Sequence, residues 1–141
     1  MTKYDFELIE FFFADYGIKS DRNGDMLSVH LVDGIVLRFH NSDNEQDICF
    51  GFDGPWHCHA VDDGIQFSNN EGFYIELNGY LDFIEALVCG DIIVCSEYRK
   101  GSLCDVYPFH IQYLDEGDLK YIDNDTEYRL RCFVLEKKKI K

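Results

Sequence analysis

Residues that could do chemistry gather in the segment 51–60, which reads GFDGPWHCHA. In an extended backbone alternate side chains point to the same side, so His57 and His59 share a face, as two ligands of one metal ion must. Nearby carboxylates can supply further oxygen ligands: Asp53, Asp62 and Asp63. One interpretation of the segment is therefore a site for a divalent metal, the cofactor that these residues suggest.

Two other interpretations of this segment stay open. Trp56 is the only tryptophan of the chain, and its large ring can anchor a structural loop. The loop can also contact a ligand or a partner. His-x-His pairs occur in cupin-type metal sites, but the glycine and glutamate spacing that should follow is missing here. We therefore favour the structural loop over metal binding.

Nucleophilic catalysis has less support. Cys58 lies between two histidines, but adjacent residues of a strand point to opposite faces, so neither imidazole is placed to act as its base. The chain has no Gly-x-Ser-x-Gly, Gly-x-Gly-x-x-Gly or P-loop pattern. We assign no catalytic residue, and the sequence favours a binding protein over an enzyme.

The charge of the chain narrows the class of partner. It has 27 Asp and Glu against 13 Lys and Arg, a net charge of −14. Lys137, Lys138, Lys139 and Lys141 form a basic tail, and without them the balance is 9 against 27, or −18. Such a body repels nucleic acids and anionic membranes and attracts a basic protein. The candidate contacts are acids in predicted loops: Asp43, Glu45, Asp47, Asp62, Asp63, Asp115, Glu116 and Asp118.

The pattern of the six cysteines indicates the cellular compartment of the protein. None forms a Cys-x-x-Cys pair, and most lie in apolar stretches, where a free cysteine behaves as a small buried hydrophobic residue. No signal segment is visible, and the apolar run 11–14 is too short to span a bilayer. We expect reduced, mostly buried thiols and a cytoplasmic protein.

Two helices are predicted. The first runs from Thr2 to Tyr16, with Thr2 as its N-cap and Gly17 as its stop. The second runs from Tyr80 to Cys89 and ends at Gly90. It should be largely buried, because only a narrow polar stripe interrupts its apolar surface.

The segment from Met26 to His40 predicts a β-hairpin whose register can be argued. Apolar residues alternate on both sides of a turn at Asp33-Gly34. A two-residue loop would place the two apolar rows on opposite faces. A three-residue loop, 32–34, pairs Leu31 with Ile35 and unites the rows on one face, so we expect this loop.

The remaining pattern predicts an α+β fold with a mainly antiparallel sheet of about six to seven strands, an N-terminal helix and one buried middle helix. Residues 1–136 are expected to form one domain, followed by the basic tail 137–141. The further strands are expected at Ile48–Phe52, Phe73–Leu77, Ile92–Tyr98, Leu103–Ile111 and Thr126–Leu135. The strands 92–98 and 103–111 carry apolar residues on both faces, which predicts central positions in the sheet.

Two resemblances bear on function. Pro55, Trp56, His57 and His59, with the strand 74–77, the helix 80–88 and the strand 91–97, resemble a group of small uncharacterised bacterial proteins. Their motifs imply no particular activity. In size, acidity and order of elements the chain is also similar to immunity proteins of bacterial toxin systems. This likeness implies an inhibitor of a basic toxin or enzyme, and the alternative remains a metal-binding protein or metal-dependent enzyme that uses His57 and His59.

Overall fold

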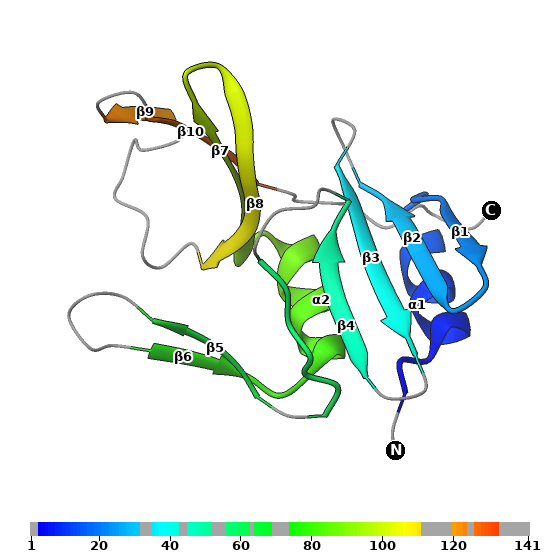
Figure 1. Ribbon diagram of the computed structural model, residues 1–141. Coiled ribbons are helices and arrows are strands. Elements are labelled where there is room, and N and C mark those ends of the chain that lie inside the picture. The colour runs from blue at the N-terminus through cyan, green and yellow to red at the C-terminus, as the bar shows by residue number, and fades with distance from the viewer. Residues whose placement is uncertain are drawn as a thin grey trace.

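The computed structural model describes residues 3–31, 35–42, 45–51, 56–62, 64–68, 74–110, 120–123 and 126–132. These residues form two helices and ten strands (Figure 1). The helices are α1 (Phe6–Ala14) and α2 (Tyr80–Cys89). The strands are β1 (Ser20–Asn23), β2 (Met26–His30), β3 (Val36–Asn41), β4 (Gln46–Phe50), β5 (Ile65–Ser68), β6 (Tyr74–Leu77), β7 (Ile92–Arg99), β8 (Ser102–His110), β9 (Lys120–Asp123) and β10 (Thr126–Cys132).

The strands form three sheets rather than one. Their orders are β1-β2-β3-β4, β8-β7-β10-β9 and β5-β6, and every pairing among the described residues is antiparallel. The α+β class is confirmed, but a single sheet of six to seven strands is not. Three strands, β1, β5 and β9, were not predicted from the sequence. β1 reads SDRN, and a polar edge strand of this kind carries no apolar alternation to reveal it.

The predicted hairpin has the expected register. Val29 lies opposite Leu37 and Leu27 opposite Phe39, and all four side chains are fully buried. The backbone N–H of Leu31 donates to the Ile35 carbonyl at 2.8 Å, so these residues are paired as predicted. The turn itself, residues 32–34, lies outside the described residues. One buried face therefore fixed the register.

The first helix begins later than expected. Asp5, not Thr2, is its N-cap, and an Asp5 carboxylate oxygen accepts the Leu8 backbone N–H at 3.0 Å. A carboxylate at this position satisfies an N–H that has no partner within the helix and also interacts favourably with the helix dipole. Thr2 lies outside the described residues. The helix ends at Ala14, earlier than the predicted Tyr16, and Gly17 follows in the left-handed region with φ 75°.

The second helix has the predicted bounds. Gly90 caps its C-terminus with φ 85°, and its N–H donates to carbonyls of the last turn. The exposed stripe is wider than expected, because Leu81 is 44% exposed beside the polar positions. The buried side chains of the helix are Tyr80, Phe83, Ile84, Ala86, Leu87 and Val88.

Two expectations about burial were wrong. β8 is an edge strand, whereas we expected it to be central; it carries Pro108, which has no N–H to donate and is tolerated at an edge. The cysteines are less buried than predicted. Among the five whose side chains are described, Cys95 is buried, Cys89 is exposed, and Cys49, Cys58 and Cys104 are half-buried. All five are free thiols.

The helices cover one face of the β1–β4 sheet. Figure 1 shows α1 and α2 behind this sheet, and its apolar face contributes Leu27, Val29, Leu37 and Phe39 to one cluster of buried side chains. The same cluster includes residues of α1, α2, β7 and β8. Within the described ranges, no helix is long and apolar enough to cross a membrane. The other face of the β1–β4 sheet carries His57 and His59.

Candidate functional site

The histidine loop, residues 56–62, extends the β1–β4 sheet. Cys58 pairs with Ile48 of β4 through two backbone hydrogen bonds of 2.7 and 3.0 Å. The Trp56 ring lies 5.6 Å from the Phe50 ring and stacks 6.4 Å from Phe83 of α2. These contacts support the interpretation of a loop that Trp56 anchors.

Cys58 and the two histidines occupy opposite faces, as the alternation predicted. The half-buried Cys58 side chain packs against the core, while His57 and His59 are exposed. Burial raises the pKa of the Cys58 thiol, which keeps it protonated at neutral pH. Neither imidazole is on the side of this thiol, and the geometry does not make Cys58 a nucleophile.

His59 is held by its neighbours on β4. Its Nδ1 atom lies 2.9 Å from the Gln46 carbonyl oxygen, which fixes this nitrogen as a donor. Its Nε2 atom lies 3.1 Å from a Glu45 carboxylate oxygen, and Nδ1 lies 3.6 Å from Asp47. Two of the acids predicted to bind a partner thus contact one of the histidines predicted to bind a metal.

The strand register aligns further polar residues on this outer face. His40 lies opposite Asp47, and Arg38 lies opposite Cys49. Since Cys58 pairs with Ile48, the same register brings His57 beside Cys49 and His59 beside Asp47. The Arg38 Nε and Asp47 Oδ1 atoms are buried and make no hydrogen bond in the described part of the chain.

Two imidazoles that could bind a metal ion lie next to each other, but the described residues contain no complete set of metal ligands. The rings of His57 and His59 lie 4.8 Å apart, which agrees with a shared face. No group of three or more His, Cys, Asp or Glu side chains within the described segments is arranged to hold a metal ion. Asp53 and Asp63 lie outside these segments. Asp62 instead lines a separate hollow.

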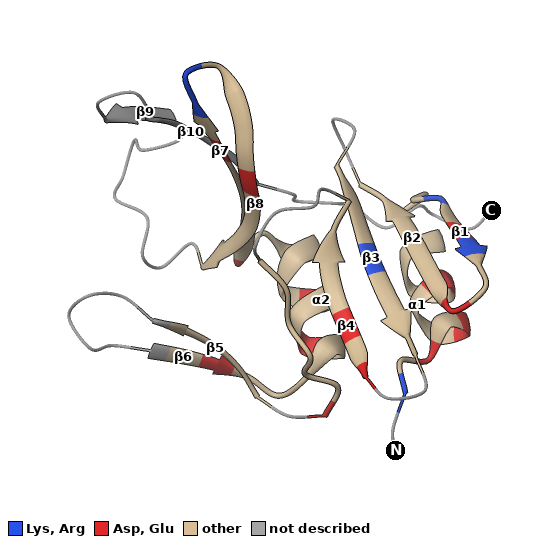
Figure 2. Cartoon of the chain, viewed as in Figure 1, with Lys and Arg blue, Asp and Glu red and all other residues tan. Residues whose placement is uncertain are grey.

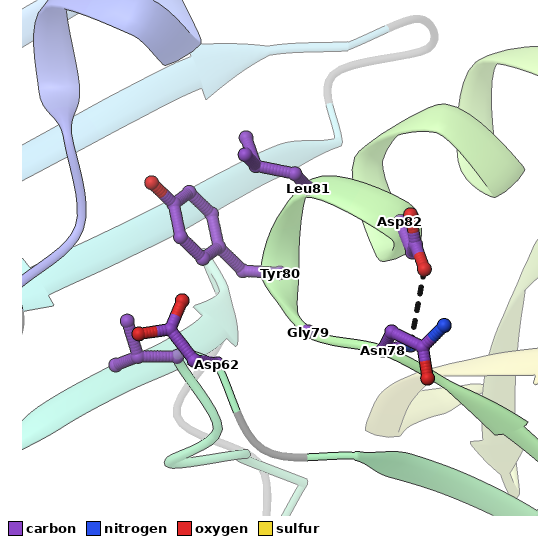
Figure 3. A pocket seen from close by; sticks show the side chains of 7 residues that line it. Asp62, Asn78, Gly79, Tyr80, Leu81 and Asp82 are labelled. Atoms are coloured by element: carbon purple, nitrogen blue, oxygen red, sulfur yellow. Dashed lines mark hydrogen bonds between the residues drawn. The ribbon is translucent and has the colours of Figure 1, made fainter.

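That hollow, of about 330 Å³, lies at the N-terminus of α2 (Figure 3). Asp62 faces it from the end of the histidine loop, and Asp82 faces it from the first turn of the helix. Asp82 also accepts the Asn78 backbone N–H at 3.1 Å, the bond drawn in Figure 3. The other predicted partner-binding acids lie outside the described residues: Asp43, Asp63, Asp115, Glu116 and Asp118.

A second surface, formed by exposed apolar residues of the helices, was not predicted from the sequence. Phe11 is 71% exposed and Leu8 is 44% exposed. The signal was available in the helical period, because Phe11 lies about 200° around the helix from both Ile9 and Phe13, which are buried. A second hollow, of about 260 Å³, lies beside these two residues.

No family model matches the chain, and searches of curated proteins and of solved structures returned no match.

Proposed function

We propose that this protein is an acidic protein-binding module that recognises a basic partner, in its specific form an immunity-type inhibitor of a basic toxin or enzyme. The observation that carries the proposal is the excess of acids, 27 Asp and Glu against 13 Lys and Arg. Among the described side chains, Glu10 is the only acid that forms an ion pair with a lysine or arginine, Arg22.

Most of the other described acids are at exposed positions. Figure 2 shows acids on α1, α2 and β4 and also on β6 and β8, while the described basic residues are fewer and scattered. A field of one sign accelerates the encounter with a partner of opposite sign, and this acceleration weakens as salt rises. Such steering is the property that an inhibitor of a basic protein needs.

The test is a selection of binders without charge bias, from a displayed library of small folded domains. The selected domains should be net basic. Their association rate should fall at least about tenfold when NaCl rises from about 0.05 to about 0.5 M, while dissociation changes much less. Neutral or acidic binders, or an association rate indifferent to salt, would contradict the proposal.

Charge-reversal variants show which acids accelerate the encounter with the basic partner. Glu45→Lys and Asp62→Lys should slow association if the histidine loop and its neighbours face the partner. Glu76→Lys, at an exposed position on β6, is the matched control for net charge. An equal effect of all three variants would indicate that only the total charge matters, and would contradict a local contact at these acids.

A second candidate function is binding of a divalent metal by His57 and His59, and the 4.8 Å separation of their rings favours it. Metal analysis of the purified protein should then find a stoichiometric metal that both His57→Ala and His59→Ala remove. His30→Ala is the control, since His30 lies on the same sheet but contacts Asp21. Retention of the metal in both loop variants would contradict this candidate.

A further inference from the structure

The N-terminal ends of the two helices meet at a single junction. The Asp5 backbone N–H donates to the Tyr80 hydroxyl at 3.2 Å, and the Tyr4 and Tyr80 rings pack edge to face at 5.0 Å. The Tyr80 N–H in turn donates to the Val61 carbonyl at 3.0 Å. The start of α1, the start of α2 and the end of the histidine loop are therefore held together.

A hollow lies on each side of this junction. Asp5, Glu7, Leu8 and Phe11 line the first, and the segment 78–82 lines the second together with Val61 and Asp62. Because Asp5 belongs to one hollow and its bonding partner Tyr80 to the other, the two hollows are neighbours. We call this surface the helix-end face and define it by Leu8, Phe11 and Leu81 with Asp5, Glu7 and Asp82.

The helix-end face combines exposed apolar groups with acids. Leu8, Phe11 and Leu81 are the large apolar side chains most exposed in the described part of the chain, at 44, 71 and 44%. A mostly exposed phenylalanine is a costly surface residue, and interfaces use such aromatic groups as central anchors. The first hollow carries Asp5 and Glu7 beside its apolar groups, and the second carries Asp82.

We infer that the helix-end face is the docking surface for a basic, amphipathic segment of the partner protein, an inference that rests on the proposed function. Apolar side chains of that segment would cover Phe11, Leu8 and Leu81, and its lysines or arginines would meet Glu7 and Asp82. Apolar contact supplies the affinity, while the opposite charges set the orientation and the encounter rate.

The same charges disfavour two other occupants. A second copy of the chain would bring acids against acids across the contact, which is repulsive. An anionic membrane surface would be repelled in the same way. A basic segment is the occupant whose charge matches both hollows.

The experiment uses three labelled synthetic peptides of equal length as probes and the full chain as receptor. The first peptide combines Lys with Leu and Phe, the second replaces its apolar residues by Ser, and the third replaces Lys by Glu. Fluorescence anisotropy should show that the first binds at least about tenfold more tightly than the second, and that the third does not bind. Amide chemical shifts should move around Leu8, Phe11 and Leu81.

Matched variants then test whether the first peptide binds at the helix-end face. Phe11→Ser should weaken binding of the first peptide about tenfold or more, and Glu7→Lys with Asp82→Lys should weaken it and flatten its salt dependence. Glu76→Lys, a single charge reversal at an exposed position of β6 outside this face, should change the affinity less than about threefold. Circular dichroism of each variant establishes that it is folded.

The contrary outcomes separate the two proposals. If the second peptide binds as tightly as the first, or if Phe11→Ser leaves binding of the first peptide unchanged, docking at the helix-end face is overturned. Recognition of a basic partner is not contradicted by either result. Failure of all three peptides to bind overturns the face alone, since the domain selection tests the function independently. Preference for the Glu peptide overturns both. A dimer in sedimentation that Phe11→Ser dissociates would assign the face to a second copy and overturn the basic segment.

Discussion

The histidine loop and the helix-end face differ in how their side chains are engaged. In the loop, Trp56 packs on Phe50 and Phe83, and His59 contacts a backbone carbonyl and two carboxylates. On the helix-end face Phe11 is mostly open to water and Leu8 is partly so. The loop holds the rarer residue types, yet much of their bonding capacity is used within the molecule. Availability to a partner therefore depends on what a residue's neighbours already satisfy, and not on how unusual the residue is.

The largest expected effect is at the anchor of the histidine loop. Trp56→Ala should lower the free energy of unfolding by about 2–3 kcal/mol, less than the ~3–5 kcal/mol of a fully buried tryptophan because the ring is half-buried. Urea unfolding followed by circular dichroism measures this change, and Trp56→Phe is the milder control. A cost below about 0.5 kcal/mol would show that the loop does not depend on its tryptophan and would remove the contrast between the two surfaces.

A smaller effect is expected where the N-terminal segment meets the loop. The buried Tyr4 hydroxyl donates to the Ala60 carbonyl at 2.9 Å. Tyr4→Phe keeps the ring but removes this bond, so it should cost about 1 kcal/mol. Tyr16→Phe, a half-buried tyrosine at the far end of the first helix, is the control and should cost less. Equal costs in urea unfolding would contradict a specific role for the Tyr4 bond.

The link between the loop and β8 should make stability depend on pH. Burial raises the pKa of Asp105 and the charge of Glu97 adds to the shift, although bonds from the Val106 and Trp56 backbone N–H groups oppose it. An acid whose pKa is higher in the folded state favours folding in its protonated form. Wild-type stability should therefore rise relative to Asp105→Asn as the pH falls from 7 through the raised pKa. Parallel curves of unfolding free energy against pH for the two proteins would contradict this coupling.

The smallest effect on stability is expected at the helix-end face. Phe11→Ser should change the free energy of unfolding by no more than about 0.5 kcal/mol, because its ring is mostly in water already. Phe13→Ser, in the same helix but fully buried, is the contrasting variant and should destabilise strongly. A large loss in Phe11→Ser would mean that this ring serves the fold, and the face would no longer be available for docking.

Several features of the fold could be predicted from the sequence because they depend on neighbours along the chain. Alternation around Asp33-Gly34 gave the hairpin register, since a shift by one residue would expose one of the apolar rows. Gly90 and the apolar pattern before it gave the bounds of the second helix. The start of the first helix was misplaced because Thr2 and Asp5 are both acceptable N-caps, and local pattern alone does not choose between them.

For the candidate sites, the sequence by itself determined the acidity of the body and the shared face of His57 and His59. Tertiary structure decided the rest. The Asp5–Tyr80 bond that joins the two hollows spans 75 positions of the chain, and the contact of His59 with Gln46 spans 13. Whether an apolar residue such as Phe11 is covered depends on which elements pack against its helix, and those elements are brought there by burial of the common core. Periodicity shows which faces an element has, but only packing decides which of them meets water.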